Sequence, residues 1–250
     1  GGLVGSEMCI RDSYNEAGRL DIENFKAFLE SNPEFQVLFV DDGSTDTTLS
    51  LLNIMHESIS SQVSVLPLKQ NRGKAEAVRQ GFIEALKHKP LFIGYWDADL
   101  ATPLEPAIRF REILKANESL QAVIGSRVRL LGRQISRPAL RHYLGRIFAT
   151  FSSLSLGFAV YDTQCGAKLF RVSDALSTIF QQPFIGKWVF DVEILKRISG
   201  LHSKGVLPPV EKAVLEYPLE SWSDTPGSKL SPVSMVLSAF DLFRLWLRHD

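Results

Sequence analysis

The chain has 250 residues, a length typical of one large α/β domain with an appendage. Apolar residues make up 45% of the chain and charged residues 22%, which is enough for a sizeable core and excludes disorder over most of the length. The 28 basic residues are balanced by 28 acidic ones, so the chain lacks the overall positive charge that attracts nucleic acid, and local groups must hold any anionic ligand.

Residues 1–13 show neither the spacing of a helix nor the alternation of a strand. They also lack the basic start and apolar run of a signal peptide. Their string resembles translated sequencing-adaptor sequence. We therefore expect residues 1–13 to be non-native and the native start of the protein to be lost.

From residue 16 onward, helices and strands are predicted to alternate. Apolar residues at helical spacing predict a first helix from Glu16 to about Ser31. The short apolar run Gln36–Val40 is typical of a strand that is buried on both faces. The cycle then repeats, with helices expected at 47–60, 74–88 and 103–117 and strands at 63–68, 91–96 and 121–126. This alternation predicts a mainly parallel sheet sandwiched by helices.

The alternation ends after Arg127, where a basic, irregular stretch leads into a long helix expected at 139–157. We then expect a compact segment at 160–171, helices at 173–181 and 189–199, and an extended region at 206–219. Two interpretations stay open for the amphipathic C-terminal stretch, 231–250: a helix docked on the domain, or a helix that lies in a membrane interface. No run reaches the ~18–20 uncharged apolar residues of a membrane span.

Two acidic clusters directly follow predicted strands. Asp41 and Asp42 come after the first strand, and Asp97 and Asp99 come after the strand at 91–96. Because ligands of open α/β sheets bind beyond the carboxyl ends of the strands, we expect both clusters at one edge of the sheet. Such oxygen ligands suit Mg²⁺ or Mn²⁺ carrying substrate phosphates. A polar loop with a helix cap is the alternative for Asp-x-Asp alone, and the second cluster favours the metal.

Basic residues flank these acidic clusters. Lys74 follows Gly73 at the start of a predicted helix, where backbone N–H groups and the helix dipole could hold an anion. The chain has no P-loop motif and no Gly-x-Gly-x-x-Gly after a strand, which argues against a P-loop nucleotidase and a dinucleotide oxidoreductase. A second basic group suits a diphosphate and a further phosphate, with a solvated surface as the alternative: Arg127, Arg133, Arg137, Arg141 and Lys168. The five histidines show no ligand spacing, and we expect them to be structural or exposed.

Five short motifs together resemble the inverting nucleotide-sugar glycosyltransferases of family 2, which have the GT-A fold. In family order they are Tyr14-Asn15-Glu16, Val40-Asp41-Asp42-Gly43-Ser44-Thr45-Asp46, Asn71-Arg72-Gly73-Lys74, Asp97-Ala98-Asp99 and Gly125-Ser126-Arg127. The resemblance implies a GT-A domain at 14–230. Segments 162–170, 188–193 and 222–229 are more similar to the dolichyl-phosphate β-glucosyltransferase branch than to the dolichyl-phosphate mannose synthases.

The resemblance implies a role for each matched residue. Contact with the nucleotide sugar is implied for Asn15, Glu16, Asp41, Asp42, Lys74, Asp97, Gln164 and Lys168. A divalent metal, Mg²⁺ or Mn²⁺, is implied at Asp97 and Asp99. The acceptor phosphate is implied at Arg127, Arg141 and Lys229, and the implied catalytic residues are Asp99, Arg127 and Arg141.

The implied reaction transfers glucose from UDP-glucose to a dolichyl or polyprenyl phosphate, with inversion, on a cytoplasmic, membrane-associated enzyme at the cytosolic face of the ER or plasma membrane. Ala101 stands where mannose synthases carry a metal-binding Gln, which favours glucose over the alternative donor GDP-mannose. Residues 1–13 do not match the family's apolar first strand, which ends in Pro-x-Tyr-Asn-Glu, so we expect this strand to be missing or substituted. The alternative of another class is a nucleotide-binding protein without catalysis.

Overall fold

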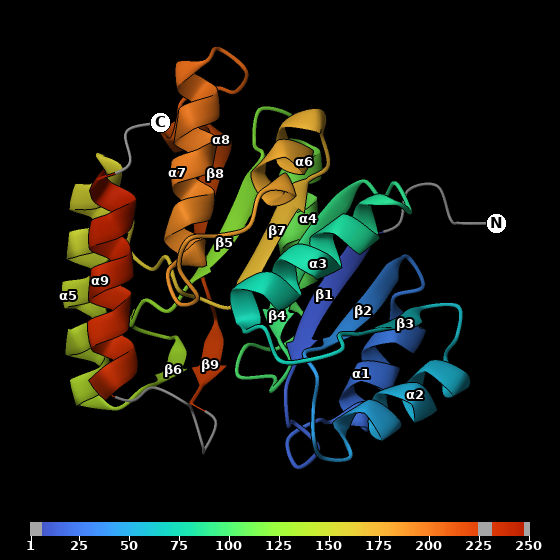
Figure 1. Ribbon diagram of the computed structural model, residues 1–250. Coiled ribbons are helices and arrows are strands. Elements are labelled where there is room, and N and C mark those ends of the chain that lie inside the picture. Colours follow the sequence, from blue (N-terminus) through green and yellow to red (C-terminus); the bar gives the residue numbers. More distant parts are fainter. Residues whose placement is uncertain (1–6, 225–231, 248–250) are drawn as a thin grey trace.

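The structure is a computed structural model that describes residues 7–224 and 232–247. Within these residues, the centre of the molecule is a seven-stranded sheet (Figure 1). Its strands, in spatial order, are β3 (Val63–Pro67), β2 (Phe35–Asp41), β1 (Glu7–Ser13), β4 (Phe92–Asp97), β7 (Ala167–Arg171), β5 (Ala122–Ser126) and β8 (Val214–Pro218). Neighbouring strands run parallel, except that β7 is antiparallel to both β4 and β5. The predicted mainly parallel α/β sheet is confirmed.

Helices cover both faces of the sheet (Figure 1). One face carries α1 (Ile22–Ser31), α2 (Thr48–Ser58) and α4 (Pro106–Ala116), which pack around buried apolar side chains of β2 and β4. The other face carries α3 (Lys74–Leu86), α6 (Asp174–Gln181), α7 (Phe190–Ser203) and the single turn α8 (Val210–Ala213). There Phe82 stacks on Phe180 with 3.7 Å between the ring centroids. The two apolar layers hold the carboxyl ends of the strands in fixed positions.

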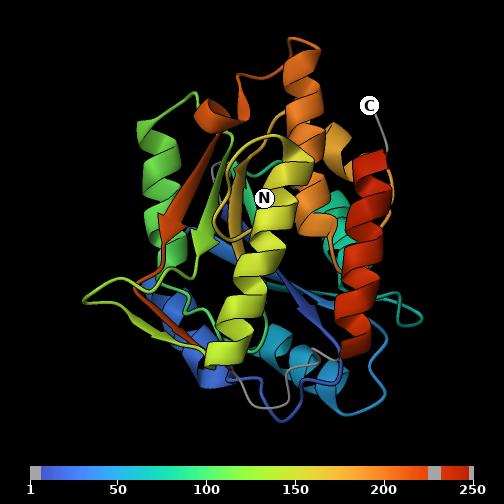
Figure 2. The ribbon, with the colours of Figure 1, turned by 90° about the vertical axis from the view of Figure 1, so that its left-hand side faces the viewer.

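A second layer lies beside the sheet. The short strands β6 (Gln134–Ser136) and β9 (Ser221–Ser223) pair in parallel, and the helices α5 (Ala139–Leu156) and α9 (Pro232–Leu247) lie side by side next to them (Figures 1 and 2). On α9, Leu242 and Leu245 are buried against Val189 and Val192 at the start of α7. The C-terminal helix is therefore docked on the domain, one of its two interpretations. None of the helices in the described ranges is both long and apolar enough to cross a membrane.

Residues 7–13 form a strand, although their sequence lacks the alternation typical of one. These residues form β1, the central strand, which pairs in parallel with β2 on one side and β4 on the other. The strand is unusual because Glu7 and Arg11 are fully buried within it. These two charged residues flank the apolar run Met8–Ile10, so the sequence pattern does not indicate a strand. The strand forms because its backbone pairs with β2 and with β4. Of the two expectations for the first strand, missing or substituted, the first is wrong, and the second stays a prediction.

Several predicted boundaries shift for local reasons. The first helix begins at Ile22 rather than Glu16, because the carboxylate of Asp21 accepts a hydrogen bond from Asn24 N at 3.1 Å and caps it there. The compact segment at 160–171 contains the antiparallel strand β7, and the extended region at 206–219 contains α8 as well as β8. The long helix expected at 139–157 is confirmed as α5, which ends at Gly157 in the left-handed conformation.

Candidate active site

The acidic residues after β2 are buried and bound to neighbouring backbone. The carboxylate of Asp42 accepts hydrogen bonds from the N–H groups of Arg72 and Gly73 at 2.8 and 2.7 Å. Asp41 accepts one from Ser44 N at 3.2 Å. Burial raises the pKa of Asp42, and the two N–H groups oppose this rise. Asp42 therefore fastens the loop before α3 to the end of β2.

The residues after β1 are held against the same region. Asn15 N donates to Ser44 Oγ at 3.0 Å, and Asn15 Oδ1 accepts from Thr45 N at 2.9 Å. Glu16 N donates to Thr48 Oγ1 at 2.9 Å. The motifs predicted to contact the nucleotide sugar thus interlock, and they bring Asn15, Glu16 and the end of β2 to one place at the sheet edge.

Lys74, the first residue of α3, lies between two carboxylates. Its ammonium forms an ion pair with Asp97 and lies 4.0 Å from Asp12 Oδ1. Burial raises the pKa of Asp12 to about 6, although Lys74 opposes the rise. For Asp97, burial also acts to raise the pKa, but the charge and hydrogen bond of Lys74, together with the charges of Arg127 and Lys168, lower it. Asp42 binds the backbone of Arg72 and Gly73, and the next residue, Lys74, binds Asp97. The loop before α3 therefore connects the two acidic clusters, which lie at one edge of the sheet as predicted.

Asp97 is held from several sides. Its N–H donates to Gly166 O at 3.0 Å, and its carbonyl oxygen accepts from Arg11 Nη1 at 2.8 Å. A Cβ at Gly166 would lie 1.9 Å from Asp97 Oδ2, so only glycine leaves space for this carboxylate. Asp99 is half-buried, and its Oδ1 accepts a hydrogen bond from Ala101 N at 3.1 Å.

The donor set around Asp97 and Asp99 fits a divalent cation that is shared with a phosphate. The described residues contain no cluster of three or more His, Cys, Asp or Glu side chains suited to a metal. Two carboxylates are nevertheless the usual protein share of an Mg²⁺ site, where water and substrate phosphates complete the coordination. Lys74 already neutralises one oxygen of Asp97, which leaves Asp99 as the carboxylate with fewer competing partners.

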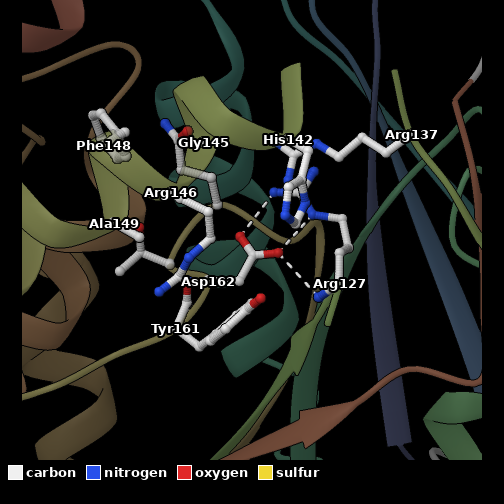
Figure 3. A pocket seen from close by; sticks show the side chains of 11 residues that line it. Arg127, Arg137, His142, Gly145, Arg146, Phe148, Ala149, Tyr161 and Asp162 are labelled. Atoms are coloured by element: carbon white, nitrogen blue, oxygen red, sulfur yellow. Dashed lines mark hydrogen bonds and ion pairs between the residues drawn. The ribbon is translucent and has the colours of Figure 1, made fainter. Parts of the chain in front are cut away.

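Arg127, directly after β5, forms a bidentate ion pair with Asp162. Its Nε and Nη2 donate to Asp162 at 2.6 and 2.8 Å, and its backbone N donates at 3.1 Å (Figure 3). Burial would raise the pKa of Asp162, but the charge and hydrogen bonds of Arg127 lower it to about 2. Glu216 on β8 in turn accepts from the N–H groups of Tyr161 and Asp162 at 2.8 and 2.9 Å. The orientation of Arg127 is thus set by two neighbouring segments.

A pocket lined by cationic side chains surrounds this pair (Figure 3). Arg146 on α5 donates to Tyr161 O at 2.8 Å and lies over the Tyr161 ring. Gly145 makes room for Arg137, because a Cβ there would lie 2.6 Å from its Nη2. Burial, with the charges of the surrounding arginines, lowers the pKa of His142 and favours its neutral form.

The sequence prediction for this pocket was incomplete. Arg127 and Arg137 lie in it as expected for a phosphate site, and Gln164 lines it too. His142 and Arg146 were missed, although their spacing of four residues places them on one face of a helix. The side chain of Arg141 and all of Lys229 lie outside what the structure describes. Their predicted contacts with the acceptor phosphate stay predictions.

Lys168 requires a correction. Its side chain is 1% exposed, and its ammonium donates to Cys165 O and to Asp191 Oδ1, both at 2.6 Å. Tyr95 donates its hydroxyl hydrogen to the same carboxylate oxygen. Lys168 is therefore a buried structural cation beneath the site rather than a side chain that lines the sugar. Burial in strand β7 prevents the predicted contact.

Comparison with known proteins decides the family. Residues 11–176, more than half of the chain, match the model of glycosyl transferase family 2. The chain belongs to this family. It is a glycosyltransferase. A dolichyl-phosphate beta-glucosyltransferase of Dictyostelium discoideum is 33% identical over 95% of this chain and 72% of its own length, and that of Drosophila melanogaster is 35% identical over 95% and 73%.

Solved structures of glycosyltransferases share the fold. A glucosyl-3-phosphoglycerate synthase from Mycobacterium tuberculosis in complex with UDP has a TM-score of 0.64 at 17% identity, over 98% of this chain and 82% of that one. A mannosyltransferase from Pyrobaculum calidifontis in complex with GDP-Man and Mn²⁺ has a TM-score of 0.60 at 18% identity, over 97% and 63%. The GT-A prediction for the fold is confirmed.

Proposed function

We propose that this glycosyltransferase moves glucose from UDP-glucose to a dolichyl or polyprenyl phosphate with inversion at the anomeric carbon. One observation carries the proposal: an acidic edge with Lys74, suited to a nucleotide diphosphate and a cation, adjoins a pocket of arginines suited to a second phosphate. Asp97 touches Gly166, and the same loop carries Asp162, so one loop connects both halves. The names of the relatives that share about a third of this sequence support glucose and dolichyl phosphate.

The arrangement explains how the residues act without a general base. A lipid phosphate is already anionic near pH 7, so its oxygen can attack once it is positioned in line with the anomeric carbon. Arg127, aligned by Asp162, holds that phosphate, and Arg137 and Arg146 add positive charge around it. At the acidic edge, Lys74 would neutralise charge on the departing diphosphate, and its ion pair with Asp97 supports this role.

Asp97 and Asp99 are the residues that would hold a divalent cation, with Mn²⁺ or Mg²⁺ as candidates. Bound there, the cation would act as a Lewis acid on the leaving diphosphate. Asn15, Glu16, Asp41 and Asp42 shape the adjoining loops, where the nucleoside is expected.

Asp99→Ala is expected to abolish transfer while the fold persists, because Asp99 is half-buried and bonds only locally among the described residues. The measurement is glucose transfer from UDP-glucose to dolichyl phosphate at saturating Mn²⁺. The loss should reach at least about a thousandfold, equal to roughly 4 kcal/mol of transition-state stabilisation. Near-normal turnover in the variant would refute the assignment of Asp99.

Titration calorimetry with UDP-glucose, GDP-mannose and UDP, each with Mn²⁺ and with EDTA, tests the donor. Metal-dependent binding that is tightest for UDP-glucose is the expected result. Tighter binding of GDP-mannose would identify GDP-mannose as the donor instead of UDP-glucose. Binding of UDP without turnover on any lipid phosphate would favour the non-catalytic alternative.

The outer surface of α5 and α9 is a candidate for contact with the membrane that carries the lipid acceptor. On α5, Leu140, Tyr143, Ile147, Phe151 and Leu154 follow helical spacing, and all are more than half exposed. Leu237, Phe240 and Phe243 are similarly exposed on the adjacent α9. Residues 119–161 contain six arginines and no acidic residue. An apolar stripe beside arginines suits an anionic lipid surface, and we infer a peripheral membrane association through this face.

Replacing Leu140, Ile147 and Leu154 together by Ser is expected to weaken binding to phosphatidylserine-containing vesicles about tenfold or more, because each side chain loses apolar burial in the interface. Cosedimentation measures the bound fraction. Ile54→Ser on α2 is the matched control, since Ile54 is equally exposed on a different part of the molecule. Equal binding of the triple variant and wild type would contradict the membrane assignment.

A further inference from the structure

The loop between α6 and α7 is fixed by side chains of three other segments. Ile185 N donates to Glu193 Oε2 at 2.8 Å, and Gln164 Nε2 donates to Trp188 O at 3.2 Å. The carboxylate of Asp241 on α9 lies against Gly186, next to the N–H of Lys187, which acts to lower its pKa. The backbone on both sides of Lys187 is therefore held in place from α7, from the loop before β7 and from the C-terminal helix.

The contact with α9 depends on Gly186. A Cβ at this position would lie 2.5 Å from Val189 Cγ2 and 2.9 Å from Asp241 Oδ2, so a larger residue would push the helix away. Burial raises the pKa of Asp241, while the charge of Arg244 and the nearby N–H of Lys187 oppose this rise. Leu242, the next residue of α9, packs into the cluster with Val189. Apolar packing and one polar contact thus join α9 to this loop.

The side chain of Lys187 extends towards the acidic edge. A Cβ at Gly73 would lie 3.8 Å from Lys187 Cδ, which is ordinary contact distance. Gly73 directly precedes Lys74, and Asp42 holds its N–H. Lys187 is exposed, and its ammonium has no hydrogen-bond or ion-pair partner among the described residues. Lys74 at the start of α3 and Lys187 from the loop before α7 are therefore both close to Gly73.

We propose that Lys187 binds the diphosphate of the nucleotide sugar and that Asp241 is the positioning residue that holds it there. The inference rests on the proposed function, because it names a further ligand of the same donor site. A diphosphate carries charge on both phosphates, and Lys74 is already paired with Asp97, so a second ammonium on the opposite side complements it. The C-terminal helix then belongs to the donor site rather than to an appendage.

Calorimetric titration of UDP in the presence of Mn²⁺ tests the role of Lys187. Lys187→Ala is expected to weaken UDP binding about tenfold, whereas Lys187→Arg keeps the charge and should remain within about threefold of wild type. Lys204→Ala is the matched control, because Lys204 is an exposed lysine at the other end of α7. Unchanged binding in Lys187→Ala would overturn the inference.

The role of Asp241 is tested by a pair of variants. Asp241→Ala removes the acceptor for Lys187 N and should weaken UDP binding, while Asp241→Asn retains an oxygen that accepts this hydrogen bond and should restore it. The Asp241→Ala effect should also shrink in the Lys187→Ala background, since the two residues act together. Leu247→Ala at the exposed end of α9 should leave UDP affinity unchanged.

The outcomes separate the inference from the proposed function. If wild type binds no nucleotide, both are wrong. If wild type binds UDP and Lys187→Ala binds it equally well, only the inference is wrong. Equal losses in Asp241→Ala and Asp241→Asn would show that Asp241 does not act through the hydrogen bond to Lys187.

Discussion

Arg127→Ala is expected to lower the free energy of unfolding by about 3–5 kcal/mol and to abolish glucosyl transfer. The substitution leaves the Asp162 carboxylate largely buried without the two guanidinium donors that hold it at 2.6 and 2.8 Å. It also removes the cation expected to orient the acceptor phosphate. Urea denaturation measures the first effect and the transfer assay the second.

Two further variants separate stability from chemistry. The double variant Arg127→Met/Asp162→Asn removes both charges and keeps an oxygen that accepts the hydrogen bond of Arg127 N, so it should recover most of the stability but none of the activity. Arg133→Ala breaks a more exposed pair with Glu220, of 2.9 Å, and should cost less than about 1 kcal/mol. A stable and fully active Arg127→Ala variant would contradict both the stabilising role of the ion pair and the role of Arg127 in orienting the acceptor phosphate.

The ion pair between Arg127 and Asp162 should make the stability of the protein depend on pH in the acidic range. Arg127 holds the pKa of folded Asp162 at about 2, whereas the unfolded carboxyl takes up its proton near pH ~3.9. The stability from this group is therefore complete above the unfolded value and is lost as the pH falls towards 2. The difference in unfolding free energy between wild type and the double variant should shrink over that range. A difference that is independent of pH would argue against the ion pair.

Arg11→Met is expected to increase the free energy of unfolding by about 1–4 kcal/mol. Arg11 is fully buried in β1, and its Nε and Nη2 have no hydrogen-bond partner among the described residues. The guanidinium lies 5.1 Å from the centroid of Phe25 and 5.8 Å from that of Trp96, an apolar setting in which burial lowers its pKa to about 10. Methionine fills similar space without desolvating a charge.

Thermal and urea denaturation of Arg11→Met check this expectation. The substitution gives up one hydrogen bond, from Arg11 Nη1 to the carbonyl oxygen of Asp97, worth about 1 kcal/mol, and the relief of desolvation should exceed it. Arg109→Met on the exposed surface of α4 is the control and should leave stability essentially unchanged. A lower denaturation midpoint for Arg11→Met would mean that the buried charge stabilises the strand.

Strand β1 also marks the limit of what the sequence could predict about the fold. The alternation from residue 16 to residue 126 was readable because each strand is a continuous apolar run and each helix has an apolar stripe. In β1 the local pattern conflicts with the tertiary pairing, since Glu7 and Arg11 are buried by neighbours that are distant in sequence. The antiparallel strand β7 was missed for a related reason, because pairing direction leaves no mark on a five-residue run.

The site residues that directly follow strands could be predicted from the sequence. Those whose position depends on packing between distant segments could not. Asp97 and Lys74 meet as the topology of the sheet requires. Lys168 looked like a site cation because it is charged and close in sequence to Gln164, but the alternation of β7 turns it into the core, towards Asp191. His142 and Arg146 carry no motif, and only the packing of α5 beside Tyr161 brings them to Arg127.

The position of β7 has a consequence for how the protein folds. Strands β3, β2, β1 and β4 form one half of the sheet and β5 and β8 the other, and β7 alone pairs with both halves. Until residues 167–171 have been synthesised, β4 and β5 each present an unpaired edge, which favours association with other chains. The loop that enters β7 carries Asp162 and Gly166. The step that closes the sheet therefore also brings Asp162 to Arg127 and Gly166 to Asp97, so a chain with an open sheet has no assembled site.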